Sequence, residues 1–182
     1  VKSTDQKSDN FVFEVFKSAN NMTDELAALS VLVNLDDDWG QKAISIFYHK
    51  WQDDALVMDK WFAVQAGSKL PGTLERVRKL IDHPKFSLTN PNKVRALIST
   101  FCAMNPWNFH RKDGKGYVFL SEFVIKLDKI NPSIAARGAS YFNQWKKYDH
   151  TRKAMMKAQL NRILETKDLT KGTFEIVTKA LA

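Results

Sequence analysis

The sequence predicts an all-α fold: an irregular, HEAT/armadillo-like helical superhelix of about ten short helices. Apolar residues recur with helical periodicity along nearly the whole chain, and no convincing alternation with period two runs beyond a few residues. The predicted helices are joined by short loops, which favours antiparallel pairs that stack on one another. No strict repeat is present, since the three Asn-Pro pairs that open helical segments are 15 and 26 residues apart. The stacking is therefore expected to be irregular.

The first five helices follow from amphipathic patterns and from residues that favour helix starts. Asn21 or Thr23 caps the second helix, and Asp24 and Glu25 occupy its first turn, where acidic residues are favoured. The third helix opens on Asp36–Asp38, which we interpret as capping residues and not as metal ligands. These five helices are expected at Phe11–Ser18, 20–35, 36–54, 55–66 and 70–84.

Three of the six remaining segments start at Asn-Pro pairs. The Asn side chain accepts hydrogen bonds from free N–H groups of the first turn, and Pro fits that turn without losing a hydrogen bond. A Gly-rich start precedes the long helix expected at residues 114–130. The expected segments are Asn90–Met104, a short turn or helix from Asn105, then 114–130, 131–148, Thr151–Leu164 and Leu169–Leu181.

The organisation predicted from the sequence is a residual linker at residues 1–8 and one helical domain at residues 9–182. The composition, 44% apolar and 26% charged, is that of a globular domain, and no apolar span of about 20 residues suggests a membrane helix. Cys102 is the only cysteine, which excludes an internal disulfide and a Cys-based zinc site. We expect it to be a small buried residue.

No catalytic or metal-ligating set is visible. The four histidines are isolated, and the chain contains no H-E-x-x-H, G-x-S-x-G, Walker or G-x-G-x-x-G pattern. The net charge of +8 comes entirely from residues 111–182, which carry 15 basic and 7 acidic residues, whereas residues 1–110 carry 13 of each. This asymmetry indicates an acidic partner surface or nucleic acid.

Two Asn-Pro helices carry cations in unusual positions. Lys93 and Arg95 lie in the first turns of a helix that is otherwise uncharged, where the helix dipole disfavours positive charge. The helix lacks a charged outer face, so we expect it to be packed on both sides. Arg137 is likewise the only charge in Asn131–Trp145 and has small neighbours. Such an arginine either binds an anion together with free N–H groups or pairs with an acid of a neighbouring helix, such as Asp59.

Several long segments resemble the C-terminal helical domain of the bacterial aminopeptidase N family, zinc aminopeptidases of the gluzincin class. They occur in the family order from about Asp9 to Ala182. The resemblance is carried by NNMTDELAALSVLVN, ALVMDKWFAVQA, FSLTNPNKVRALISTFCAMNPWNFHRKDGKGYVFL and FEIVTKALA.

The resemblance implies that this chain is the C-terminal cap of a longer, cytoplasmic enzyme. The upstream catalytic domain of that enzyme holds the zinc and the catalytic residues, none of which lies in this chain. The fragment alone is therefore expected to be inactive, without a metal, a cofactor or catalytic residues of its own. In the family the cap encloses a cavity around the active site, and Arg95 and Arg137 match family arginines that face this cavity. The implied role of both is substrate binding, in contact with the peptide beyond the cleaved residue.

On this interpretation the partners are the catalytic domain and a peptide substrate, with no role for nucleic acid or a membrane. The alternative is a helical-repeat scaffold that binds an acidic protein or nucleic acid through its basic C-terminal part. Lys93 takes the place of an arginine common in the family, and the sequence alone assigns it no role.

Overall fold

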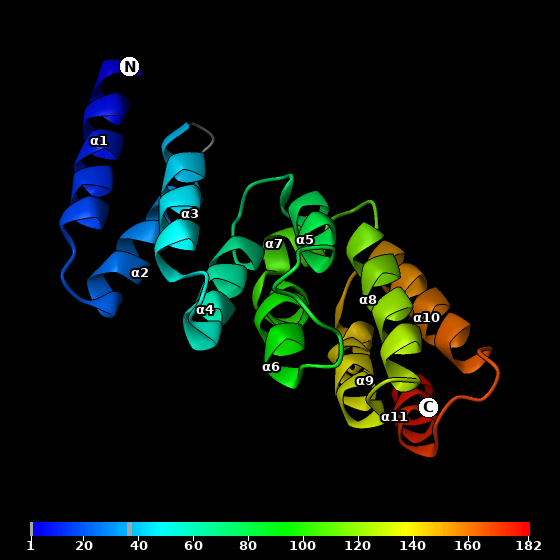
Figure 1. Cartoon of the computed structure of the whole chain (residues 1–182). Helices are drawn as coiled ribbons and strands as arrows, with labels where there is room; N and C mark the ends of the chain where they lie inside the picture. The colour runs from blue at the N-terminus through cyan, green and yellow to red at the C-terminus, as the bar shows by residue number, and fades with distance from the viewer. Residues whose placement is uncertain (1, 36–37) are drawn as a thin grey trace.

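Short helices lie side by side from one end of the molecule to the other, in a computed structural model that describes residues 2–35 and 38–182 (Figure 1). No strand occurs in these two ranges, so the predicted all-α class is confirmed. In chain order the helices are α1 (Lys2–Ser18), α2 (Met22–Leu32), α3 (Asp38–Trp51), α4 (Ala55–Ala66), α5 (Thr73–Ile81), α6 (Pro91–Val94), the π-helix η1 (Arg95–Met104), α7 (Pro106–Phe109), α8 (Lys115–Asp128), α9 (Pro132–Ala139), the 3₁₀ turns η2 (Ser140–Phe142) and η3 (Trp145–Lys147), α10 (His150–Leu164) and α11 (Lys171–Leu181).

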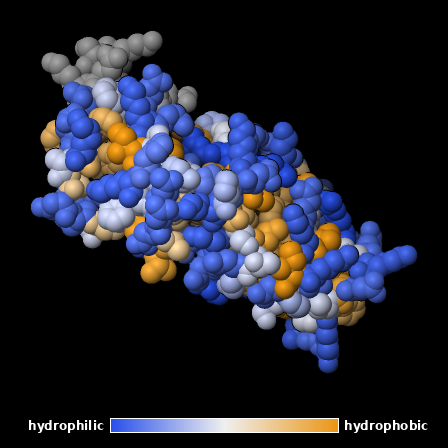
Figure 2. All heavy atoms as spheres, in the orientation of Figure 1, coloured by the Kyte–Doolittle hydropathy of each residue, from blue (hydrophilic) through white to orange (hydrophobic). Residues whose placement is uncertain are grey.

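Most helices pack against their neighbours in the chain, which gives the stack its elongated shape (Figure 1). Helices α1 to α4 follow one another, and α4 packs on the π-helix η1. At the C-terminal end α9 lies between α8 and α11, and α10 contacts both of these. One apolar core runs through the stack. Figure 2 shows hydrophobic residues of the visible face in small separate patches among hydrophilic ones.

The first helix is longer than the sequence predicts. It begins at Lys2 instead of Phe11, so most of the segment expected as linker is helical. The reason is local: no Pro or Gly interrupts the chain between Lys2 and Ser18. Asn21 is the cap of α2, with its side chain accepting a hydrogen bond from Asp24 N. The capping role expected of Asp36 and Asp37 falls outside the described residues.

Cys102 is buried, as predicted, and its burial raises the pKa of the thiol well above the usual value. Within the described part of the chain, no helix combines the length and the apolar character that a membrane crossing requires.

The expected helix Asn90–Met104 is one α-helical turn followed by a π-helix. Its apolar stripe is buried, as predicted: Val94, Leu97, Ile98 and Phe101. Its other side is open, so the expectation that the helix is packed on both sides is wrong for this chain. The wide turn brings residues four and five positions apart to the same side, and Thr100 Oγ1 donates a hydrogen bond to Arg95 O at 3.3 Å. Met104, at the end of this side, is 75% exposed.

Candidate functional site

The Asn-Pro pairs start their helices as the sequence predicts. Asn90 Oδ1 accepts hydrogen bonds from Asn92 N and Lys93 N, at 3.0 and 3.4 Å. Asn131 Oδ1 accepts one from Ile134 N at 3.3 Å. Both helices thus begin with a satisfied cap, so the cations do not compensate for a missing one. Lys93 lies in the first turn of its helix, whereas Arg137 lies in the last turn of α9, where the helix dipole favours a cation.

Lys93 is a structural residue. Its Nζ lies 2.7 Å from Asp59 Oδ1 on α4 and donates a hydrogen bond to Ala55 O, also at 2.7 Å. The Lys93 side chain is only 8% exposed and that of Asp59 21%. Asp59, a possible partner of the arginines from the sequence, therefore pairs with Lys93. This pair explains why a cation sits at the positive end of this helix.

Arg95 and Arg137 are both exposed, and neither forms an ion pair with an acid among the described residues. The side-chain contact of Arg95 is a long hydrogen bond of 3.4 Å from Nη1 to Asn92 Oδ1. Their positive charges are therefore not neutralised within the described chain.

The two arginines line the same hollow, of about 200 Å³, between η1 and α9. The other residues around it are uncharged: Pro91, Ser99, Thr100, Ala103, Met104, Ile134 and Tyr141. A small hollow with two unneutralised guanidinium groups and no carboxylate on its wall is suited to hold an anion, because Arg donates to carboxylates in a bidentate geometry. The structure thus brings together the two residues singled out from the sequence.

Close packing of α9 fixes the position of Arg137. Next to it in the chain, Gly138 lies against α8, and a Cβ at this position would stand 3.3 Å from Val124 Cγ2. The buried Ala135 and Ala139 lie on either side of Arg137 along α9. Small residues allow α9 to approach α8 closely, and Arg137 lines the hollow from this packed helix.

A second, more open hollow of about 580 Å³ adjoins the first along η1. The two share Arg95, Thr100 and Met104. Its other wall comes from α4 and includes Leu56 and Lys60. Lys60 was not predicted from the sequence, because a single lysine on a helix carries no distinctive signal. The structure shows that its neighbour Asp59 is engaged by Lys93.

A metal has no suited position in the described part of the chain. No group of three or more His, Cys, Asp or Glu side chains lies close enough together there to hold an ion. The described residues therefore provide no ligand set for zinc.

A partly buried polar cluster towards the C-terminal end was not predicted. His110 Nδ1 is 2.9 Å from the hydroxyl of Tyr117, and His110 Nε2 is 2.8 Å from that of Tyr148. Arg152 Nε donates to His110 O at 2.8 Å, and its Nη1 donates to Asp149 Oδ2 at 2.7 Å. The pKa of His110 is lowered, mainly by burial and also by the charge of Arg152. Burial raises the pKa of Tyr117 to about 12. This cluster ties α8 to the start of α10.

Acidification should weaken the fold through His110. A histidine with a lowered folded-state pKa is more often neutral in the folded than in the unfolded chain, so the stabilisation is complete above about pH 6.5 and is lost as pH falls through the folded pKa. Urea unfolding at pH 7.5 and 5.5 should therefore show a smaller loss for His110→Gln than for the wild type. His150→Gln, at an exposed position, is the control. Equal losses in all three proteins would contradict the assignment.

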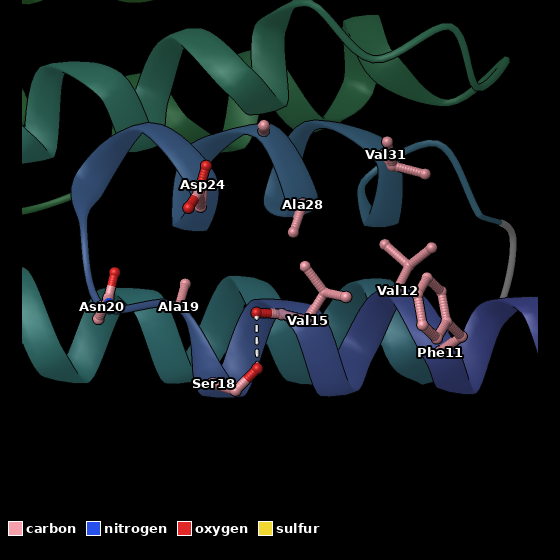
Figure 3. Close-up of a pocket in the computed structure, with 10 residues that line it drawn as sticks. Phe11, Val12, Val15, Ser18, Ala19, Asn20, Asp24, Ala28 and Val31 are labelled. Atoms are coloured by element: carbon pink, nitrogen blue, oxygen red, sulfur yellow. Dashed lines mark hydrogen bonds between the residues drawn. The ribbon is translucent and has the colours of Figure 1, made fainter.

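An apolar hollow of about 500 Å³ lies at the other end of the molecule, between α1 and α2. Phe11, Val12 and Val15 of α1 face Ala28 and Val31 of α2 across it (Figure 3). Phe11 is 68% exposed, a large value for an aromatic side chain next to a core. The hollow contains one charged residue, Asp24, and offers no basis for anion binding or catalysis.

Together the fold and the hollow define a helical-repeat domain with one open face that carries two unneutralised arginines. The whole chain, residues 1–182, matches the family described as "Domain of unknown function (DUF3458_C) ARM repeats". The chain belongs to this family, which also confirms the armadillo-like character of the stack. It is similar to the C-terminal domain of aminopeptidase N, as the resemblance in the sequence suggested.

Curated relatives and a solved structure support this identification. The chain is 43% identical to aminopeptidase N of Caulobacter vibrioides over 166 residues, which are 91% of this chain and 19% of that protein. It is 41% identical to aminopeptidase N of Escherichia coli over 175 residues, 96% of this chain and 20% of that protein. The structure of Legionella pneumophila aminopeptidase A in complex with aspartic acid superposes with a TM-score of 0.92 and 36% identity, over 97% of this chain and 21% of that one. The chain thus spans about a fifth of the length of these relatives.

Proposed function

We propose that this chain is the non-catalytic C-terminal domain of a zinc metalloaminopeptidase that removes N-terminal residues from peptides. The domain encloses the active-site cavity, and its hollow between η1 and α9 binds the peptide beyond the cleaved residue. One observation carries this proposal: Arg95 and Arg137, from segments far apart in the sequence, line one hollow with no acid to neutralise them.

The ligand group is the carboxylate at the far end of a short peptide. Arg presents a planar fork of donors that matches a carboxylate. Two such groups orient the carboxylate and neutralise its charge. Pro91, Ala103 and Ile134 provide apolar wall around them. Holding the far end orients the peptide for hydrolysis at its near end, without any part in the bond-breaking step.

The chemistry itself belongs to the upstream catalytic domain of the same protein. The similarity covers about a fifth of the relatives' length, and the proposal places the zinc and the catalytic residues in the remainder. The isolated fragment is then inactive, and the protein acts in the cytoplasm, where a single unpaired Cys102 is ordinary.

The apolar hollow between α1 and α2 is the proposed contact surface for the preceding part of the parent protein. Terminal repeats of helical stacks normally present a polar outer face, whereas Phe11, Val15 and Val31 are exposed here. A surface of this kind favours burial against another part of the same protein over contact with water.

Arginine substitutions in the full-length protein test the proposal. Arg95→Gln or Arg137→Gln should raise KM for a tripeptide about tenfold, since a hydrogen bond to a charged group contributes about 1.5 kcal/mol or more. An aminoacyl-p-nitroanilide lacks the far carboxylate, so its hydrolysis should be unchanged. Steady-state kinetics with both substrates provide the measurement.

Two controls sharpen the interpretation. The wild type should show a raised KM for a tripeptide amide, similar to the KM of the arginine variants for the free acid. In the amide the anion is missing from the substrate, whereas in the variants the cation is missing from the protein. Arg78→Gln removes an exposed arginine that pairs with Glu122 outside the hollow, at 3.2 Å, and should change neither substrate's kinetics. Unchanged tripeptide kinetics in both arginine variants would refute the proposal.

A further inference from the structure

A third unneutralised cation adjoins the arginine pair. Lys60 of α4 is exposed and lines the second hollow together with Arg95. It forms no ion pair with an acid among the described residues. Asp59 lines the same hollow, but its carboxylate lies against Lys93 Nζ at 2.7 Å. The charge of Lys60 is therefore left for a ligand.

The two hollows form one continuous surface with Arg95 in the middle. Arg95, Thr100 and Met104 belong to both, so a ligand can extend from one hollow into the other along η1. Cations then stand in the order Arg137, Arg95, Lys60, contributed by α9, η1 and α4. The exposed Leu56, 70% accessible, and Met104 provide apolar surface beside them.

Three adjacent cations exceed what a single carboxylate neutralises. We infer that Lys60 and Arg95 form a second anion position, and that the protein prefers peptides whose last residue is Asp or Glu. The inference rests on the proposed function. The terminal carboxylate lies between the two arginines in the smaller hollow, where paired forks hold a fixed group. The side-chain carboxylate extends into the open hollow toward Lys60, whose long flexible stem suits a mobile anion.

Matched tripeptides that differ only at the last residue test the inference in the full-length protein. The wild type should hydrolyse Ala-Ala-Glu with a kcat/KM about threefold above that of Ala-Ala-Gln, the scale of an exposed ion pair. Lys60→Gln should abolish this preference and leave the kcat/KM of Ala-Ala-Gln unchanged. The wild-type preference should also shrink at high ionic strength, because exposed charges are screened.

Lys69→Gln is the matched control, since Lys69 is exposed and lines neither hollow. If Lys60→Gln keeps the preference for Ala-Ala-Glu, or loses kcat/KM equally for both tripeptides, the second anion position is overturned. The proposed function is judged separately: Arg137→Gln should still raise the KM for both tripeptides, whatever the result for Lys60→Gln. If neither arginine variant changes tripeptide kinetics, the proposed function fails and the second position fails with it.

Discussion

Replacing Lys93 with alanine is expected to lower the free energy of unfolding by about 3 kcal/mol, because it leaves the carboxylate of Asp59 without its partner in a largely buried position. The side chain also loses its hydrogen bond to Ala55 O. Arg95→Ala, only two residues away, should change stability by no more than about 0.5 kcal/mol, since its side chain is exposed and forms no ion pair with a described acid. Urea denaturation of the three proteins measures both effects.

A double variant separates the ion pair from packing. Lys93→Met with Asp59→Leu removes both charges, so it should be more stable than Lys93→Ala. If Lys93→Ala and Arg95→Ala lower the free energy of unfolding equally, the ion pair of Lys93 does not stabilise the fold as the structure indicates.

Gly116→Ala should destabilise the chain by about 2 kcal/mol or more, as in other cases of overpacking. A Cβ at this position would collide with the backbone of Phe109, standing 2.9 Å from its Cα and nearer still to its carbonyl oxygen. Backbone atoms cannot rotate away as a flexible side chain can. The clash would force apart α7 and the start of α8, which pack against each other.

Gly172→Ala is the matched control and should have the opposite sign. Gly172 also lies near the start of a helix, α11, but no atom stands within 4 Å of the Cβ position. The substitution is therefore expected to stabilise the chain by about 0.5–1 kcal/mol through helix propensity and reduced freedom of the unfolded chain. Thermal unfolding monitored by circular dichroism would show both shifts. A stable Gly116→Ala protein would contradict the close approach of these helices.

Local signals account for what the sequence predicted well. The caps at Asn21, Asn90 and Asn131 are confirmed because a cap depends on a few consecutive residues. The buried stripe of η1 is confirmed because apolar periodicity reflects which side meets the core. The wide π turn escaped prediction, since the same stripe is compatible with an α-helix.

Charge pairing depends on packing between distant segments, and here the sequence left alternatives open. Asp59 was a possible partner for the arginines, whereas the approach of α4 to α6 pairs it with Lys93. The shared hollow of Arg95 and Arg137 was suggested by the family resemblance and not by their spacing. Lys60 was not predicted for the same reason, because only the packing of the segments shows whether an acid lies near it.

The division between Lys93 and its neighbours has an evolutionary consequence. Lys93 is bound into the fold, whereas Arg95, Arg137 and Lys60 carry charges that the described chain does not use to stabilise itself. Substitutions at these three positions are therefore expected to have little effect on the stability of the fold. Under the proposed function, the residues that maintain the fold are thus distinct from those that contact the peptide, so related proteins can change the second set while keeping the first.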